Sequence, residues 1–296
     1  MNLRQLKIFV MVCKTKNMSK AAKKLYMSQP AISQTISELE EDLNIKLFDR
    51  IKKRLKLTYA GKILLRNSKR ILNLVDETEN IIKDIVNMNQ GKLRIGASMT
   101  IGTYLLPQII EGFLNKYNKI HLPFTIDNTK VIEDMILDNK LDLALVEGPI
   151  YCKDILVEHF FDDQLYLMCS SKHSWSHKRK INSEELKGED FIIREKGSGT
   201  RETIENIMRK HSIKYHVTHV FNNIEAIKRA IISNLGVSIL PEICVKEELK
   251  KGLLVKVDIQ GIEFKRKFSI IYHKDKYRSQ LFNNFVNHIY TNICKS

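Results

Sequence analysis

The sequence has few of the residues and patterns that define several large protein classes. Its 296 residues include only five scattered cysteines and no CxxC pair, so neither a disulfide framework nor a zinc site is expected. No apolar run approaches the ~20 residues that span a bilayer, and the start of the chain has no apolar signal core. We therefore expect two or three domains, a reducing cytoplasmic compartment and no membrane partner.

Signatures of catalysis and of nucleotide binding are also lacking. The segment Gly197-Ser198-Gly199 forms neither a GxxxxGK[ST] phosphate loop nor a complete dinucleotide fingerprint. His173 and His177 are four residues apart, but the Ser and Trp residues between them indicate an exposed loop. No Ser, His and Asp set stands out. We predict no enzyme activity, no catalytic residue, no metal and no cofactor.

Acidic residues are scarce at the start of the chain. The first 70 residues contain seventeen Lys or Arg and only five acids, whereas the formal net charge of the whole chain is +15. This asymmetry favours a polyanionic partner for the segment. A lysine-rich solvated face has the same composition, so charge alone leaves both interpretations open.

Three short helices are predicted within this basic segment. Apolar residues at helical spacing indicate the first helix over residues 3–13. Ser19 is expected to cap a second helix over residues 20–25. Ser28 is expected to cap a third, in which Pro30 is tolerated because amides of the first turn lack intrahelical partners. Two short helices joined by a brief turn are typical of a helix-turn-helix.

The third helix has one apolar side and one polar side. Ile32, Ile36 and Leu39 face inward. The outward side is rich in Ser and Gln, with Gln29, Ser33, Gln34 and Ser37. Gln can pair with adenine through two hydrogen bonds, and Ser can contact base edges and phosphates. A plain three-helix bundle explains the apolar spacing equally well, but not this face flanked by lysines. The pattern favours a recognition helix for the major groove.

A basic hairpin and a long helix follow. Leu55 and Leu57 alternate with Arg54 and Lys56, which predicts a half-buried strand and a wing suited to phosphate or minor-groove contact. Thr58 is expected to cap a helix that continues to about residue 88. Residues recur along it every seven positions, at Leu64, Ile71, Thr78 and Ile85. This seam predicts a dimer whose two-fold symmetry matches a palindromic site.

Five segments of this region share the order and spacing of one known family. They are residues 3–6 (LRQL), 19–25 (SKAAKKL), 28–39 (SQPAISQTISEL), 47–50 (LFDR) and 57–61 (LTYAG). They resemble the LysR-type bacterial transcriptional regulators, and the resemblance continues through the rest of the chain. It implies DNA contacts by Gln29, Pro30, Ser33, Gln34, Ser37, Arg54 and Thr58. Many relatives carry Arg where this chain has Gln34, and this departure is expected to alter the base preference or to weaken a phosphate contact.

From residue 91 onward, predicted strands and helices alternate. Strands are expected at residues 93–97, 121–126, 141–146, 165–169, 191–194 and 268–272. This alternation predicts an open, largely parallel α/β sheet. The resemblance implies two periplasmic-binding-protein-like subdomains of type II that grip an effector between them. The expected division is a winged helix-turn-helix over 1–58, a linker helix over 59–89, subdomain I over 91–162 with 267–296, and subdomain II over 163–266.

Two strand-to-helix loops, at residues 98–100 and 196–201, are suited to an anion. Each supplies hydroxyls and free helix amides, and the second contains glycines that let the backbone approach a ligand. A tight structural turn explains those glycines equally well. The resemblance places both loops at the effector cleft. The predicted effector contacts are Ser98, Thr100, Ser198 and Thr200, with Glu147 and Asn223 as weaker candidates.

The function expected from these features is sequence-specific transcriptional regulation, with an activator role. The expected partners are duplex DNA with an interrupted palindromic operator, a small effector, further copies of the chain in a dimer or tetramer, and RNA polymerase. Residues 194–201 are similar to the loop of sulfur-assimilation and carbon-fixation regulators, which indicates a small inorganic anion or compact carboxylate. Two alternatives stay open: an enzyme fused to a DNA-binding module, and a redox switch using Cys152, Cys169 or Cys244. Apolar surroundings in the sequence favour buried structural thiols at Cys169 and Cys244.

Overall fold

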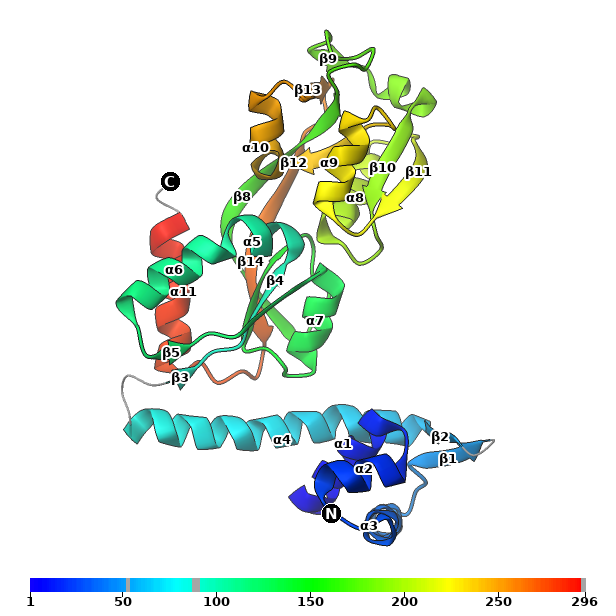
Figure 1. Cartoon of the computed structure of the whole chain (residues 1–296), viewed down its shortest axis with the longest axis vertical. Coiled ribbons are helices and arrows are strands. Elements are labelled where there is room, and N and C mark those ends of the chain that lie inside the picture. The colour runs from blue at the N-terminus through cyan, green and yellow to red at the C-terminus, as the bar shows by residue number, and fades with distance from the viewer. Residues whose placement is uncertain (52–53, 87–90, 294–296) are drawn as a thin grey trace. The chain divides into compact units, whose positions relative to one another are not determined.

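A computed structural model describes residues 1–51, 54–86 and 91–293 of the chain (Figure 1). The chain divides into two units, Met1–Met88 and Asn89–Ser296, and each is described by itself. Within the described residues, no helix combines the length and the apolar character needed to cross a membrane.

The first unit consists of three short helices, a β-hairpin and a long helix. Its elements are α1 (Leu3–Thr15), α2 (Met18–Leu25), α3 (Gln29–Asp42), β1 (Phe48–Ile51), β2 (Arg54–Leu57) and α4 (Tyr59–Val86). Their apolar faces meet in one core. The core residues are Ile8, Phe9, Val12, Ala21, Ala22, Ile32, Ile36, Leu39 and Leu47. The helix-turn-helix predicted from the sequence is therefore present, with its apolar stripes buried as expected.

Polar side chains start the helices of this unit. Ser28 caps α3 as predicted, since its hydroxyl accepts a hydrogen bond from the Ala31 amide at 3.4 Å. The prediction that Ser19 caps α2 is wrong. Asn17 has an extended backbone and its side-chain oxygen accepts from the Lys20 amide at 2.9 Å, so the helix already begins at Met18.

A buried carboxylate joins the end of α3 to the start of the hairpin. Glu40 is 8% exposed, and one of its oxygens accepts hydrogen bonds from the amides of Leu47 at 2.9 Å and Phe48 at 3.2 Å. Its other oxygen lies 2.7 Å from Lys46 Nζ. Burial alone would raise the pKa of Glu40, but Lys46 and the two amides outweigh it and hold the pKa below its usual value.

The long helix α4 begins tightly against the loop before β1. The Thr58 hydroxyl accepts from the Gly61 amide at 2.9 Å, which confirms Thr58 as the cap. A side chain at Gly61 would place its Cβ 2.2 Å from the Leu47 carbonyl oxygen, so only glycine fits there. Further along, Leu74 and Ile82 are each 58% exposed. An exposed apolar stripe of this kind is unusual for a helix without a partner.

The second unit is an α/β structure. Its first part contains β3 (Gly91–Lys92), β4 (Ile95–Ser98), α5 (Met99–Tyr104), α6 (Leu106–Lys116), β5 (Ile120–His121), β6 (Phe124–Asp127), α7 (Thr129–Leu137), β7 (Leu143–Glu147) and β8 (Ile155–Ser170). Its second part contains β9 (Lys180–Ile181), the 3-10 helix η1 (Ser183–Gly188), β10 (Asp190–Arg194), α8 (Gly199–Lys210), β11 (His216–Phe221), α9 (Ile224–Ile232), β12 (Ser238–Pro241), α10 (Glu242–Lys250), β13 (Leu254–Ile259), β14 (Phe264–His273) and α11 (Gln280–Ile293).

The main sheet of this unit is mixed, so the prediction of a largely parallel sheet is wrong. Its eight described strands follow the order β6-β4-β7-β14-β8-β13-β9, with β12 also paired to β8. The pairs β6–β4 and β4–β7 are parallel, whereas β14 is antiparallel to both β7 and β8. The sequence signal for β8 was weak over residues 155–164, where acidic and polar residues interrupt the apolar pattern.

The long strands β8 and β14 extend through both halves of this unit, as Figure 1 shows. At one end they contribute to a core around Phe113, Phe268 and Phe285, and at the other to a core around Phe191 and Ile204. The β8–β14 ladder contains one register shift, between Phe268 and Ser269. The two halves are therefore joined by a continuous antiparallel ribbon with a bulge near its middle.

We predict that Glu40→Gln destabilises the first unit by roughly 1–3 kcal/mol, because the amides of Leu47 and Phe48 lose a charged acceptor. The lowered pKa of Glu40 means that its contribution is present above the ordinary Glu pKa of about 4.3 and is lost as the pH falls. Urea unfolding at about pH 7 and pH 4 measures both effects. Glu41→Gln, at an exposed position on the same helix, is the control and should change little.

Candidate functional site

A buried polar cluster lies in the second unit where β7, β10 and β14 approach the start of α8. Its members are all less than a tenth exposed: Ser98, Thr100, Glu147, Asp163, Arg194, Ser198, Thr200 and Arg266. Five of these are predicted effector residues. Asp163, Arg194 and Arg266 were missed by the sequence analysis.

Arg266 occupies the centre of the cluster. Its Nε donates to Asp163 Oδ2 at 2.6 Å, and its Nη1 donates to Thr200 Oγ1 at 2.7 Å and lies 3.9 Å from Glu147 Oε1. Its Nη2 is buried and has no hydrogen-bond partner within the described residues. The guanidinium therefore joins three elements of the unit and keeps one donor free.

Arg194, at the end of β10, is held in a similar way. Its Nε and Nη2 donate to the carboxylate of Glu195 at 2.8 and 3.0 Å. The side chain is 2% exposed, and its Nη1 has no partner within the described part of the chain. A buried donor without an acceptor costs about 1–3 kcal/mol, more when charged, so two such donors in one cluster indicate a place for an acceptor group.

Glu147, the last residue of β7, is the buried carboxyl of this cluster. It is 1% exposed, and its Oε2 accepts a hydrogen bond from the hydroxyl of Ser98. The Ser98 oxygen in turn accepts from the Glu147 amide at 3.2 Å. Burial raises the pKa of Glu147, although the charges of Arg266 and Arg194 and the nearby donors of Thr100 act in the opposite direction.

Glycines allow the chain to pack closely beside the cluster. A Cβ on Gly199 would lie 1.8 Å from the Glu147 carbonyl oxygen, and Gly197 has a φ of +89°. The Thr129 hydroxyl connects the same two segments, since it donates to the Glu147 carbonyl at 3.1 Å and accepts from the Gly199 amide at 3.2 Å. The glycines therefore serve a tight turn and a close approach to the backbone of Glu147. The approach of this loop to a ligand stays a prediction.

The residues predicted to contact DNA lie on α3 and around the hairpin. Gln29, Pro30, Gln34 and Ser37 are exposed on α3, and Ser33 is half-buried. The Gln34 amide donates to Glu38 Oε1 at 3.0 Å. Thr58 uses its hydroxyl within the protein, where it donates to the Lys46 carbonyl at 2.8 Å. Arg54 is the first residue of β2, and its side chain lies outside what the structure describes.

Comparison with known families matches both units. A model described as the bacterial regulatory helix-turn-helix protein of the lysR family matches residues 3–62. A model described as the LysR substrate binding domain matches residues 87–292. The chain belongs to the LysR family of transcriptional regulators. This confirms the predicted family and fold class, with a helix-turn-helix domain followed by an effector-binding domain.

Individual similar proteins match this LysR-family chain over nearly its whole length. A probable RuBisCO transcriptional regulator of Chlorokybus atmophyticus is 37% identical over 96% of this chain and 92% of its own length. Among solved structures, a full-length OxyR variant from Pseudomonas aeruginosa has a TM-score of 0.72 at 23% identity and covers 98% of this chain and 94% of its own. The CcmR regulatory domain of Synechocystis PCC6803 in complex with 2-PG has a TM-score of 0.64 at 29% identity, and the match covers 68% of this chain and 97% of that domain.

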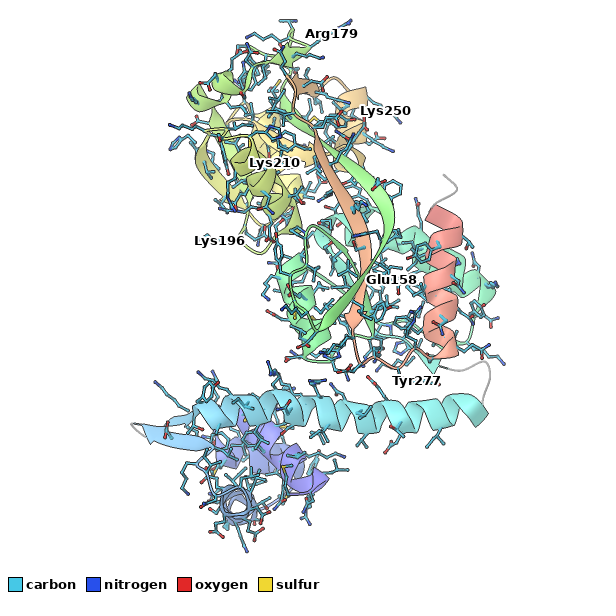
Figure 2. The ribbon with its side chains drawn as sticks, turned by 180° about the vertical axis from the view of Figure 1, so that it is seen from behind. Glu158, Arg179, Lys196, Lys210, Lys250 and Tyr277 are labelled. Carbon is cyan, nitrogen blue, oxygen red and sulfur yellow. The ribbon has the colours of Figure 1, made fainter. Side chains whose placement is uncertain are left out.

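Within this LysR protein, the remaining predicted effector residues have structural contacts. Ser198 caps α8, because its hydroxyl accepts from the Arg201 amide at 3.5 Å. Its neighbour Lys196 is exposed in the loop before α8 (Figure 2). Asn223 is exposed and caps α9, where it accepts from the Glu225 amide at 2.7 Å. In the described structure Asn223 makes its hydrogen bonds within this helix cap and not with the buried cluster.

Two of the cysteine candidates, Cys169 and Cys244, and one of the histidines, His173, lie in environments typical of structural residues. Cys169 and Cys244 are buried, and burial raises the pKa of the Cys169 thiol to about 11 and that of Cys244 still further. Cys294 lies outside the described residues. His173 Nε2 is 3.1 Å from Glu189, and no group of metal-binding side chains occurs among the described residues. A raised thiol pKa lowers the thiolate fraction, which favours the structural interpretation of these cysteines.

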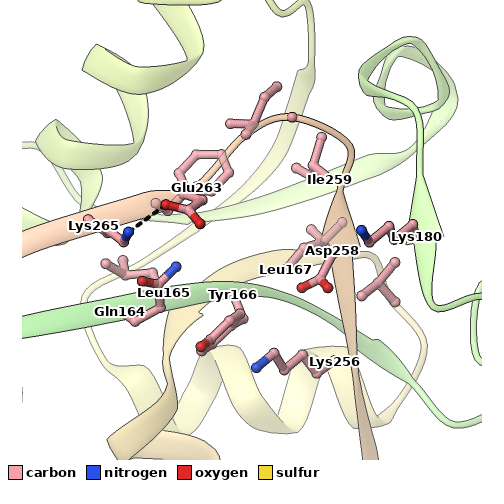
Figure 3. Close-up of a pocket in the computed structure, with 14 residues that line it drawn as sticks. Gln164, Leu165, Tyr166, Leu167, Lys180, Lys256, Asp258, Ile259, Glu263 and Lys265 are labelled. Carbon is pink, nitrogen blue, oxygen red and sulfur yellow. Dashed lines mark ion pairs between the residues drawn. The ribbon is translucent and has the colours of Figure 1, made fainter.

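A pocket of about 580 Å³ lies elsewhere in this unit, between β8, β13 and the start of β14 (Figure 3). Its charged side chains largely have partners of their own. Lys265 pairs with Glu263 at 2.5 Å, and Lys256 Nζ lies 3.1 Å from the centre of the Tyr166 ring. None of the predicted effector residues lines it. The buried cluster contains five of the predicted effector residues and is the candidate effector site.

One signal in the sequence could have identified Arg266. Phe264, Arg266 and Phe268 alternate with lysines along β14, and all three are buried. A strand with period two places them on the same face, so the arginine shares the buried face with two phenylalanines. The run Lys265-Arg266-Lys267 has the composition of a solvated surface, which concealed this pattern.

We predict that Gly199→Ala destabilises the second unit by roughly 1–3 kcal/mol or more, because the added Cβ collides with the backbone oxygen of Glu147. Thermal unfolding of the full chain should show a lower Tm for this unit. Gly188→Ala is the matched control, since a Cβ at Gly188 meets nothing within 4 Å. Equal Tm values for the two variants would contradict the close approach.

Proposed function

We propose that this LysR-type regulator is controlled by a compact anion that binds at the buried cluster. The observation that carries the proposal is the pair of buried guanidinium donors, Arg194 Nη1 and Arg266 Nη2, that lack acceptors within the described part of the chain. Guanidinium groups bind carboxylate and phosphate oxygens through charge-assisted hydrogen bonds. Thr200 Oγ1 accepts from Arg266 Nη1 at 2.7 Å, Ser98 and Thr100 add buried hydroxyls to the cluster, and the N-terminus of α8 favours negative charge.

The comparisons support a small ligand in this domain. The similar CcmR regulatory domain is described in complex with 2-PG. In the present chain, Phe160 and Phe268 belong to one apolar core, and Leu165 and Phe264 belong to another. The change from one core to the other falls between residues 161 and 165 on β8 and between residues 264 and 268 on β14. This separation supports two effector subdomains, 91–162 with 267–296 and 163–266, with the anion bound between them.

The first unit is proposed to bind duplex DNA with an interrupted palindromic operator. The exposed Ser/Gln face of α3 would enter the major groove, and the basic hairpin would contact the backbone or the minor groove. The proposed contacts are Gln29, Pro30, Ser33, Gln34, Ser37, Arg54 and Thr58. The exposed apolar residues of α4, including Leu74 and Ile82, support a dimer seam. We further propose that dimers assemble into a tetramer, that the protein contacts RNA polymerase and that it acts as an activator.

The effector assignment is tested by replacing one of the two arginines. We expect Arg194→Gln to weaken binding of inorganic sulfate or phosphate by at least about tenfold, because it removes a charged, buried donor. Operator binding without an effector should be unchanged. Isothermal titration calorimetry measures the first effect and a DNA-binding assay the second. The control is Arg229→Gln, at an exposed position on α9. Unchanged anion affinity in Arg194→Gln would disprove the assignment.

The DNA interface is tested by Arg54→Ala and Gln34→Ala. Loss of a phosphate contact at Arg54 should weaken binding to all sequences nearly equally and reduce the salt slope by about one. Loss of a base contact at Gln34 should instead cost roughly 1–3 kcal/mol at one operator position and leave binding to other DNA unchanged. Fluorescence anisotropy over a range of salt concentrations separates the two. A purely sequence-specific effect of Arg54→Ala would contradict the wing assignment.

A further inference from the structure

The proposed anion site contains a carboxyl group, which needs a physical explanation. Glu147 is 1% exposed, lies 3.9 Å from Arg266 Nη1 and accepts a hydrogen bond from the hydroxyl of Ser98. Thr100 and Thr200 could each bind an anion as hydroxyl donors, because the Thr100 hydroxyl has no partner within the described residues and the Thr200 oxygen only accepts from Arg266. An ionised Glu147 could only accept hydrogen bonds, and it would repel an anion placed against the arginines.

The groups that surround Glu147 come from several elements. Arg266 on β14 and Arg194 on β10 bring positive charge, and Thr100 on α5 brings neutral donors. Asp163 on β8 is already paired with Arg266 at 2.6 Å. The Cys244 thiol on α10 lies close enough to sense the charge of Glu147 and has a raised pKa, so it stays neutral. Arg266 lies 3.9 Å from Glu147 but 2.6 Å from Asp163, so Glu147 is the less well compensated carboxyl and the one that a proton would neutralise.

The charges of the arginines are already partly balanced. Asp163 pairs with Arg266, and Glu195 pairs with Arg194 through two hydrogen bonds. Adding an ionised Glu147 and a bound anion would leave excess negative charge in a buried site. Two acidic groups that share such a site hold a proton between them, as paired carboxyls in proteins do. Burial also raises the pKa of Glu147, which favours its protonated form.

We propose that the site binds its anion together with one proton, which lies between Glu147 and the ligand. The site then selects anions that carry a proton of their own, such as hydrogen phosphate, the monoanion of a phosphate monoester or a hydroxy acid. A fully ionised anion such as sulfate binds only when Glu147 itself is protonated. This inference rests on the proposed function, because it concerns the same site.

The first experiment uses sulfate, which has no titrating group near neutral pH. Its affinity for the full-length protein is measured by calorimetry from about pH 5.5 to about pH 8.5. Protonated Glu147 favours sulfate, so affinity is highest at low pH and falls by at least about tenfold as the pH rises above the pKa of Glu147. In Glu147→Gln, whose amide cannot ionise, the affinity should change by less than about twofold over the same range.

The second experiment compares two anions at about pH 8.5. Inorganic phosphate is then mainly hydrogen phosphate and can donate its proton to Glu147, whereas sulfate cannot. Wild-type protein should prefer phosphate by at least about tenfold, and Glu147→Gln should reduce this preference to within about twofold. Glu247→Gln is the control, because the side chain of Glu247 is 67% exposed on α10 and its charge plays no part in the balance of the cluster. It should keep both the pH dependence and the preference for phosphate.

The outcomes separate this inference from the function on which it rests. A sulfate affinity that does not change with pH in the wild-type protein would overturn the inference, and this measurement holds even if Glu147→Gln fails to fold. A pH dependence that persists in Glu147→Gln would overturn it too, since another group would then carry the proton. If neither sulfate nor phosphate binds the wild-type protein at any pH, the compact-anion function fails and the inference fails with it.

Discussion

The effector-binding unit depends on the ion pair between Arg266 and Asp163. These residues stand opposite each other on β14 and β8, and their side chains are 1% and 7% exposed. Removing one partner of a buried pair costs about 3–5 kcal/mol, because the other charge is left without compensation. The pair fixes the direction of the guanidinium, which can then reach Thr200 on α8 and face Glu147 on β7. This one cross-strand contact therefore positions the central guanidinium of the cluster against α8 and β7.

Local chemistry made much of the first unit predictable. Ser28 and Thr58 cap helices because a hydroxyl three residues before a free amide can accept its hydrogen bond, and this relation is visible in the sequence. The boundary of α2 was harder to predict, since Asn17 and Ser19 are both good caps and only the backbone conformation selects Asn17. The connection made by Glu40 was missed because its partners lie seven and eight residues away, beyond the end of its own helix.

The cluster of the second unit was only half predictable, for a physical reason. Ser98, Thr100, Ser198 and Thr200 follow strands and start helices, positions that a sequence reveals. Arg194, Asp163 and Arg266 lie within strands, where a charged residue is normally taken to face water. The burial of Asp163 and Arg266 depends on pairing between strands about a hundred residues apart, and Arg194 is paired on β10 with Phe221 of β11. Glu147 was a weak candidate because its importance comes from the charges that the fold brings around it.

The ribbon formed by β8 and β14 has a mechanical consequence for regulation. Because both strands belong to the two apolar cores at once, those cores cannot move apart without breaking the ladder between them. A rotation of one core about the ribbon axis would keep the ladder intact, and the register shift between Phe268 and Ser269 is where the ribbon would accommodate added twist. Arg266 lies two residues from that register shift, so a twist of the ribbon there would move its guanidinium relative to Thr200 and Glu147.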